Sequence, residues 1–394
     1  MDDRRVMNQK KLTVLICWFS VVAIYTGRLN LSIVSPLMQK QGIISTEGIG
    51  LLGSMFFYTY AVGQLFSGYF GDRFSPRLMA VTGLLFAGIG NLSAAIKPSF
   101  PVLLIMWAIV NGIAQSMIWG PVLRVVSELF HGEKQTKAAI VLSLSPAVGS
   151  ITATALALCM SFFGVRTVFF VPGTILVCIS ILTFIFLPHH KSVQQKPKHE
   201  NPFKLLFFDR EVRSMIFPAG IHGVIKDNIN LWIPLYFVKS FDADIKKAAL
   251  SIFLVPLISL GGRLLFPKIY NLCGQNEKRV IAFSFLLCGV TFLPLIFCNP
   301  NLFVTVILVC LAAASINLIN TSILSIYPLR FKERGAVSSV SGMMDFITYL
   351  FAGVSSCLFG FLISTFGFSC LFGVWVVLSF ASALMLYKNK FNVL

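Results

Sequence analysis

Apolar runs of roughly 20 residues recur from one end of the sequence to the other, and each is long enough to cross a bilayer as a helix. In hydrocarbon a spanning segment must satisfy its own backbone hydrogen bonds, which favours helices. Charged residues make up only 12% of the 394 residues, too few to cover the surface of a water-soluble protein of this length. The sequence therefore predicts an all-α membrane protein.

Hydropathy, with Gly, Pro and charged residues as boundaries, divides the chain into about twelve spans. The predicted spans run roughly over residues 12–36, 49–70, 78–97, 101–127, 137–161, 166–187, 212–238, 247–270, 279–298, 301–327, 335–362 and 368–388. A polar, basic, proline-containing segment separates the first six from the last six. We therefore expect twelve transmembrane helices in two pseudo-symmetric six-helix bundles, over residues 1–187 and 212–394, joined by a linker over 188–211.

Lys and Arg, which give the chain a net charge of +17, gather in alternate loops such as GDRFSPR, HGEKQTK and LRFKER. Cytoplasmic loops are enriched in these residues, so we expect a multi-pass protein of the inner (plasma) membrane with cytoplasmic termini and linker. No soluble domain carries a basic patch, and no nucleic-acid partner is expected.

Enzymatic motifs are not visible. The nine cysteines scatter through apolar segments without metal-ligand spacing. The sequence contains neither a GxxxxGK[ST] loop nor a catalytic set of side chains. We therefore expect no enzyme, no cofactor and no metal.

The loop between the second and third spans, GYFGDRFSPR, suits a conformational latch. Gly68 permits close helix approach. Asp72 lies near a helix end, where it can accept hydrogen bonds or pair with an arginine, and Arg73 and Arg77 add positive charge. A generic basic turn is the alternative. Near the inner end of the fourth span, Arg124 is expected at a cytoplasmic gate.

Two cations lie deep in apolar spans: Arg28 about 16 residues into the first, and Lys226 about 15 residues into the seventh. A cation at the centre of a membrane helix costs about 2.5–3.5 kcal/mol on insertion scales, so such residues usually face the interior and carry function. In two similar bundles these spans are equivalent, so both side chains are expected to face a central cavity and bind one dianion. Phosphate fits, because a guanidinium binds two oxygens and an ammonium acts as a point charge. An arginine that reaches the outer surface or is paired structurally is the alternative.

Two intramembrane carboxylates, Asp227 and Asp345, are also expected to face the interior. Asp345 either neutralises Lys226 in the empty state, carries a proton, or pairs structurally with Arg263. These alternatives stay open at the level of sequence.

The position and spacing of GDRFSPR resemble the major facilitator superfamily signature G-x-x-x-D-R-x-x-x-R. The segment YTGRLNLSIVSPLM resembles the first span of the organophosphate:phosphate antiporter family, which includes glycerol-3-phosphate and hexose-6-phosphate transporters. SMIWGPVLRVVSELF resembles that family's fourth span. The residues that fall at family spacings in the first and seventh spans are Arg28, Asn30, Pro36, Lys226, Trp232, Pro234 and Tyr236.

The resemblance implies secondary exchange of an organic phosphate, of the sugar phosphate or glycerol phosphate type, for inorganic phosphate by alternating access. The partners expected are a small anionic substrate and the lipid bilayer, with the protein working as a monomer. A proton-coupled organic-anion symporter and a transport-inactive membrane sensor of phosphorylated metabolites are the alternatives. Where family members often have arginine, this chain has Lys226, and family histidine and lysine positions correspond to Pro146 and Gln64.

Three further residues are candidate substrate ligands. Tyr25 lies three residues before Arg28, on the same helix face. Tyr60 matches a tyrosine that lines the cavity in the resembled family. His222 lies one turn before Lys226. Simple packing of these side chains between helices is the alternative for each.

Overall fold

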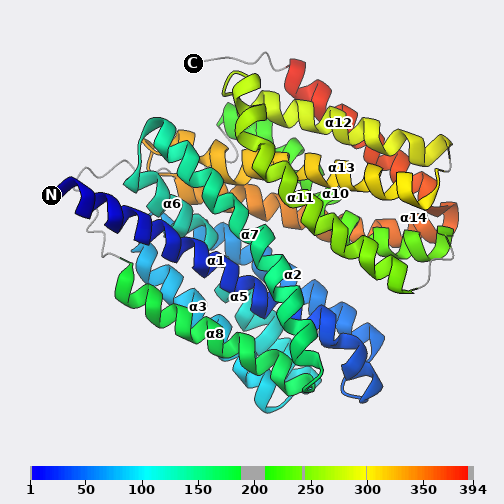
Figure 1. Ribbon diagram of the computed structural model, residues 1–394, viewed down its shortest axis with the longest axis horizontal. Coiled ribbons are helices and arrows are strands. Elements are labelled where there is room, and N and C mark those ends of the chain that lie inside the picture. Colours follow the sequence, from blue (N-terminus) through cyan, green and yellow to red (C-terminus); the bar gives the residue numbers. More distant parts are fainter. Residues whose placement is uncertain (1, 188–208, 242–244, 299, 389–394) are drawn as a thin grey trace. The chain divides into compact units, whose positions relative to one another are not determined.

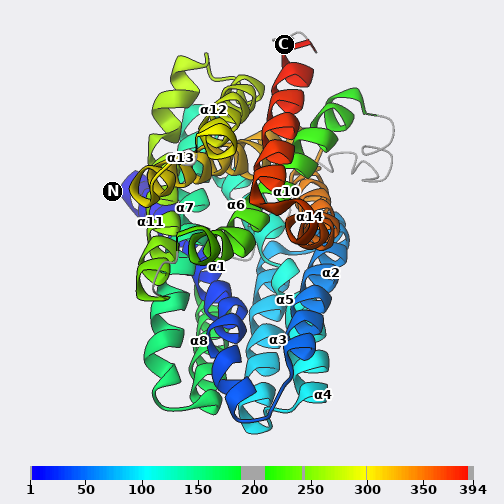
Figure 2. The same ribbon diagram turned by 90° about the vertical axis from the view of Figure 1, so that its right-hand side faces the viewer.

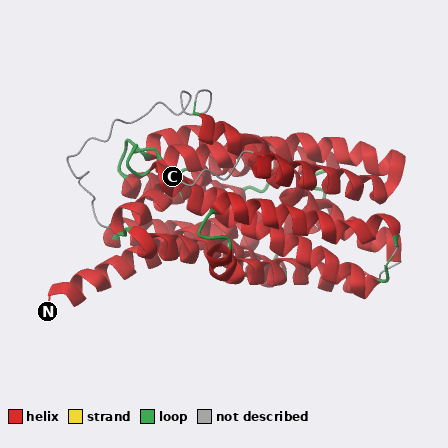
Figure 3. Ribbon diagram, turned by 90° about the horizontal axis from the view of Figure 1, so that it is seen from above, coloured by secondary structure: helices red, strands yellow, loops and turns green. Residues whose placement is uncertain are grey.

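The computed structural model of the protein describes residues 2–187, 209–241, 245–298 and 300–388. In this part of the chain each of the twelve predicted spans is helical and no residue lies in a strand (Figure 3). Nine of the described helical stretches are long and apolar enough to cross a membrane by length and composition. The predicted all-α membrane fold is confirmed. Of the predicted linker, residues 188–208 lie outside the described residues.

The first six spans are built from nine described helical elements. They are α1 (Asp2–Lys40), α2 (Thr46–Gly71), α3 (Pro76–Ile96), α4 (Phe100–Val102), η1 (Leu103–Val110), α5 (Asn111–Ser116), α6 (Trp119–Leu129), α7 (Gly132–Ser161) and α8 (Val165–Phe186), of which α4, η1, α5 and α6 together form the fourth span. The helix η1 is a π-helix, and such segments often mark functional positions. Helix α1 packs against α7, and α3 packs against α8 (Figure 1, Figure 2).

The last six spans begin with α10. They are α10 (Arg210–Phe241), α11 (Ile245–Leu272), α12 (Glu277–Phe297), α13 (Leu302–Thr321) with η2 (Ser322–Ile326) and η3 (Tyr327–Phe331), and α14 (Val337–Lys388). Helix α13 packs against α11 and α12 (Figure 1). Helix α14 contains both final spans, and Gly367, with a φ of 77°, breaks it where the sequence predicts a loop.

Polar side chains cap three helix starts in the second half of the chain. The carboxylate of Asp209 accepts the backbone N–H groups of Glu211 and Val212 at the start of α10. Asn276 caps α12 in the same way, and Asn301 caps α13. These side chains satisfy N–H groups that a helix leaves without an internal partner.

The described residues cluster into two compact units. The first unit contains the described residues up to 187 together with residues 328–346, and the second contains the remaining described residues. The first turns of α14 therefore belong to the first unit, although they follow the tenth span in sequence. The predicted bundle boundaries, 1–187 and 212–394, remain a prediction.

Candidate functional site

Arg28 lies in a cluster of aromatic rings inside the first unit. Its guanidinium carbon lies 4.2 Å from the ring centroid of Tyr60, 5.1 Å from that of Tyr25 and 5.5 Å from that of Phe56. Its Nε donates a hydrogen bond of 2.9 Å to Oε1 of Gln115. Aromatic faces attract a cation, most strongly where water is excluded, so this cluster stabilises a charge deep in a membrane span. Tyr25, predicted on the same helix face as Arg28, and Tyr60, suggested by the family resemblance, both lie beside Arg28.

Two buried amide side chains, linked by hydrogen bonds, hold Arg28 in position. Gln115 donates through Nε2 to Oδ1 of Asn111 at 2.8 Å, and Asn111 donates to the carbonyl of Gly27 at 3.1 Å. Both residues lie on α5, immediately after the π-helix η1. Because each amide is bonded at both ends, α5 holds the side chain of Arg28 and the backbone beside it in one geometry. The sequence analysis missed both amides.

Asn30 anchors the next turn of α1. Its Nδ2 donates to Oδ1 of Asn91 at 2.8 Å, and its Oδ1 accepts the indole N–H of Trp107 at 3.1 Å. Asn30 and Asn91 are fully buried. Buried polar groups are costly unless they are paired, so these bonds fix the rotation of α1 against α3 and η1.

Asp345 lies in the first unit as well, in contact with Tyr60. The Tyr60 hydroxyl lies 3.4 Å from Oδ2 of Asp345 and accepts a hydrogen bond from Nε2 of Gln64. Asp345 is 4% exposed. The side chain beneath the Arg28 guanidinium therefore also contacts a carboxylate. Arg263, the structural partner that the sequence allows for Asp345, donates from its Nε to Oδ1 of Asn317 at 2.7 Å.

Lys226 occupies the corresponding place on α10 in the second unit. Its Nζ lies 4.6 Å from the ring centroid of Tyr349 and 3.6 Å from Oδ1 of Asp227. His222 lies one turn earlier on α10, fully buried. The second unit therefore also places a cation over an aromatic face.

An asparagine follows each cation at the same distance in sequence. Asn228, two residues after Lys226, is fully buried and accepts the indole N–H of Trp232 at 2.9 Å. Its Nδ2 donates to Ser355 at 2.9 Å. Asn30 stands two residues after Arg28 and accepts an indole N–H in the same way. Each unit thus contains a cation, an intervening residue and a buried asparagine bonded to a tryptophan. The sequence shows this repeat as RLN and KDN, with the cation and the asparagine two residues apart in each, but the repeat was not part of the prediction.

Asp72 caps the N-terminus of α14. Its two carboxylate oxygens accept the backbone N–H groups of Ser338 at 2.8 Å and Ser339 at 2.6 Å. Burial raises the pKa of Asp72 to about 6, while these bonds and the charge of Arg124 act in the opposite direction. A Cβ on Gly68 would lie 2.8 Å from the Ser338 carbonyl oxygen, so only glycine fits at this contact. Asp72 therefore accepts hydrogen bonds at a helix end, which is the first of the two roles that the sequence predicts for it.

The three arginines near this loop bind backbone carbonyls. Arg73 donates to the carbonyl of Tyr69, and Arg77 donates to that of Phe184. Arg124 donates to the carbonyl of Gly71 at 2.8 Å. Arg124 also pairs with Glu128, with 2.7 Å between Nε and Oε1. Arg124 thus joins α6 to the end of α2, and Arg77, in the first turn of α3, joins α3 to α8 inside the first unit.

Nine described helical stretches are long and apolar enough to cross a membrane, and each unit places one cation deep in such a fold, an arrangement typical of a membrane carrier. The sequence profile of the Major Facilitator Superfamily matches residues 17–353. The chain belongs to this superfamily, and it is therefore a multi-pass transporter and not an enzyme.

Three comparisons show which transporters the chain is similar to. The "Probable hexose phosphate transport protein" of Chlamydia muridarum is 22% identical over 296 residues, 66% of this chain but only 64% of that protein. The "Probable sulfoacetate transporter SauU" of Cupriavidus necator is 24% identical over 392 residues, 92% of this chain and 89% of that protein. The crystal structure of the human organic anion transporter MFSD10 superposes with a TM-score of 0.78 at 14% identity, over 96% of this chain and 99% of that one, which shows a shared fold. The resemblance predicted from the sequence is confirmed.

Proposed function

We propose that the protein exchanges an organic phosphate, of the sugar phosphate or glycerol phosphate type, for inorganic phosphate by alternating access. The observation that carries this proposal is the environment of Arg28, whose guanidinium lies deep in a span within reach of three aromatic rings and one amide oxygen. A positioned guanidinium binds two oxygens of a phosphoryl group. The similarity to a protein named as a hexose phosphate transporter supports the same substrate class.

Lys226 is the second proposed phosphate ligand. An ammonium supplies a point charge without a fixed donor geometry, so it complements the planar guanidinium of Arg28. The hydroxyls of Tyr25 and Tyr60 and the imidazole of His222 are the proposed further contacts. One small dianion then satisfies both cations in a single protomer, in the inner membrane with both termini cytoplasmic.

Opening at the GDRFSPR end is proposed to require release of Asp72 from the first turn of α14. Two short bonds from N–H groups to a carboxylate, at 2.8 and 2.6 Å, hold this contact. Hydrogen bonds to a charged group contribute about 1.5–3 kcal/mol each, an energy that substrate binding is able to offset. Arg73 and Arg124 bind carbonyls near the end of α2, Gly68 allows the close approach to Ser338, and Arg77 joins the neighbouring α3 to α8.

The test of this function is exchange across proteoliposomes. Vesicles holding the purified protein are loaded with labelled inorganic phosphate, and sugar phosphates, glycerol phosphate or sulfoacetate are added outside. Antiport predicts that phosphate leaves only when an external phosphate ester is present. Efflux driven by sulfoacetate alone would contradict the phosphate assignment and would leave a transporter of sulfonated anions, the class suggested by the second relative.

A specific contact favours proton-coupled anion symport as the second candidate. Asp345, a buried carboxylate, contacts Tyr60, whose ring lies beneath Arg28. Protonation of this carboxylate would lower the repulsion between it and an arriving anion. The two candidates separate when a protonophore is added, since symport stops with the loss of the pH gradient and exchange continues.

A further inference from the structure

Two cations lie at the end of the first unit opposite the GDRFSPR loop. Lys97 follows the last residue of α3, and Arg166 is the second residue of α8. Both side chains are exposed, and neither takes part in a hydrogen bond or ion pair within the described chain. In the proposed orientation this is the outer end, where Lys and Arg are normally scarce. Their presence there is unexplained by topology or by internal pairing.

Both cations line one cavity. Its volume is about 550 Å³, and its wall also includes Gln41, Ile43 and Phe163. The residues that line it include no acidic side chain, so the cavity carries two positive charges. The lining combines charge with apolar surface, which suits an anion that has an apolar part.

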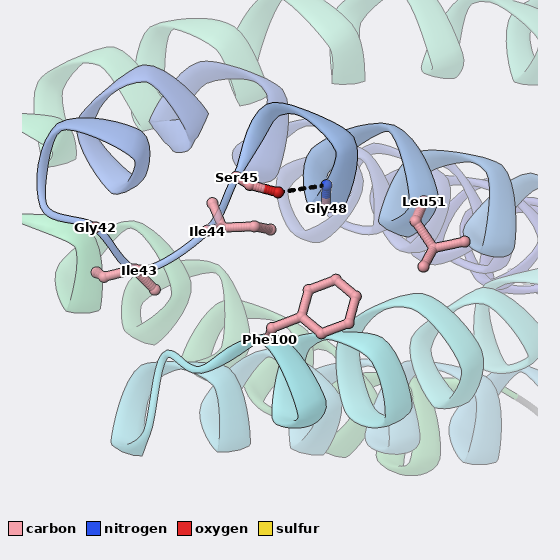
Figure 4. Close-up of a pocket in the computed structure, with 7 residues that line it drawn as sticks. All are labelled: Gly42, Ile43, Ile44, Ser45, Gly48, Leu51 and Phe100. Carbon is pink, nitrogen blue, oxygen red and sulfur yellow. Dashed lines mark hydrogen bonds between the residues drawn. The ribbon is translucent and has the colours of Figure 1, made fainter.

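A second, apolar hollow adjoins this cavity. Its volume is about 370 Å³, and Ile43 lines both cavities. Figure 4 shows the residues that line the second hollow. The side chains of Ile44, Leu51 and Phe100 surround it, and the hydroxyl of Ser45 accepts the N–H of Gly48 at 3.1 Å. Apart from that hydroxyl, the side chains that line the hollow are apolar, so the hollow offers a mainly apolar surface to a ligand.

Large apolar side chains flank the cationic cavity and are exposed. Phe162 is 89% exposed, Phe163 is 74% exposed, and Ile96, next to Lys97, is 78% exposed. Large exposed apolar side chains at the end of a span contact the acyl chains, while lysine and arginine next to them extend toward the headgroups. The cations beside them therefore lie at headgroup depth.

We infer that this end of the first unit binds an anionic phospholipid. The headgroup phosphate contacts Lys97 and Arg166, and one acyl chain lies in the hollow formed by Ile44, Leu51 and Phe100. A small soluble phosphate would satisfy the charges and leave the hollow unfilled, so a lipid fits the pair of cavities better. The inference is independent of the transported substrate, and it rests on the proposed orientation for the outer leaflet and for the unusual presence of two cations there.

The test measures lipid binding by the purified full-length chain in mild detergent. Dioleoyl phosphatidylglycerol or dioleoyl phosphatidylcholine is titrated in, and the thermal unfolding midpoint is followed for the parent protein and for Lys97→Gln/Arg166→Gln. We expect phosphatidylglycerol to raise the midpoint of the parent at lower mole fraction than phosphatidylcholine does. In the double variant the half-saturating mole fraction of phosphatidylglycerol should rise about tenfold or more, because each basic residue near an anionic headgroup contributes to binding.

The charge-matched control is Lys134→Gln/Arg213→Gln, which removes two exposed cations elsewhere. It should bind phosphatidylglycerol like the parent. Equal affinity in the parent and Lys97→Gln/Arg166→Gln would overturn the inference. If the double variant does not fold, the single Lys97→Gln variant, which alters one exposed side chain, must still weaken binding.

Two further titrations show whether the bound phosphate group belongs to a lipid or to a small soluble anion. Dihexanoyl phosphatidylglycerol, with the same headgroup on short chains, should bind more weakly than the dioleoyl lipid, because it buries less apolar surface in the hollow. Inorganic phosphate should give no response that depends on Lys97 and Arg166. A response to inorganic phosphate that the double variant loses, with no dependence on chain length, would instead define a soluble-anion site and contradict the lipid assignment.

Discussion

The hydroxyl of Tyr60 lies 3.4 Å from the carboxylate of Asp345, a residue 285 positions later in the chain. The ring of the same tyrosine lies 4.2 Å from the guanidinium carbon of Arg28. One side chain thus contacts a cation of the first span with its face and a carboxylate of the eleventh span with its edge. The proposed anion site and the proposed proton site meet at Tyr60.

Substitution of Tyr60 separates these two contacts. Tyr60→Phe keeps the ring beneath Arg28 and removes the hydroxyl, so we expect transport to persist with a raised KM. Tyr60→Leu removes the cation–π contact as well, which adds a loss of about 0.5–2 kcal/mol or roughly 2- to 30-fold in affinity. The concentration dependence of exchange by the two variants checks this order. Parent-like kinetics in Tyr60→Leu would show that the ring does not support Arg28.

Gly68 allows α2 to lie close to the first turns of α14. A Cβ there would lie 2.8 Å from the carbonyl oxygen of Ser338 and 3.1 Å from the Cα of Gly342. We expect Gly68→Ala to push α2 away from the first turns of α14 and to reduce the transport rate at least tenfold, by loss of the Asp72 contact. Initial rates of exchange measure this effect.

Gly53→Ala is the matched control on the same helix, because nothing lies within 4 Å of a Cβ at Gly53. Alanine favours a helix over glycine by about 1 kcal/mol, so this control should fold at least as well as the parent. Equal rates in Gly68→Ala and Gly53→Ala would mean that the contact near Ser338 does not control transport.

The buried asparagines that follow each cation should matter for stability. Asn30→Ala or Asn228→Ala leaves the indole N–H of Trp107 or Trp232 without its acceptor. An unsatisfied buried group costs about 1–3 kcal/mol, and we expect the free energy of unfolding to fall by that amount. Denaturant unfolding in detergent measures it, with the exposed Asn271→Ala as control. No difference among the three variants would contradict the assigned role.

Protonation of Asp72 gives a pH-dependent signal outside the membrane spans. Burial raises its folded pKa from 3.8 to about 6, so the folded protein binds this proton more tightly than the unfolded chain does. The contribution to stability is therefore fully present below about pH 3.8 and is lost as the pH rises through about 6. The infrared band of a protonated carboxyl group should disappear near pH 6 and be absent in Asp72→Asn. A titration at or below pH 4 would be the contrary result.

Hydropathy predicted the spans well and their ends poorly. The first span, predicted over 12–36, belongs to a helix that runs from Asp2 to Lys40, because a helix does not have to stop at the membrane surface. The fourth span was predicted as one run over 101–127, yet it contains the π-helix Leu103–Val110 and is interrupted by a turn at Met117 and Ile118. Hydropathy reports transfer of side chains into lipid and carries no information on hydrogen-bond register within a span.

The cations were visible in sequence because charge is rare in a span, whereas their partners were not. Gln115 lies 87 residues from Arg28, and no local spacing links the two. Likewise, the pairing of Asp72 with the first turn of α14 joins residues 266 and 267 positions apart. Long-range contacts of this kind depend on tertiary packing. The position of residues 328–346 within the first unit follows from the same packing and lay beyond prediction.

The most direct test of the account is phosphate exchange by Arg28→Ala and Lys226→Ala in proteoliposomes loaded with labelled inorganic phosphate. Each variant should insert into the membrane and keep its thermal stability, yet lose release of phosphate in response to an external sugar phosphate. Exchange at the parental rate in either variant would contradict the claim that these two cations bind the transported anion.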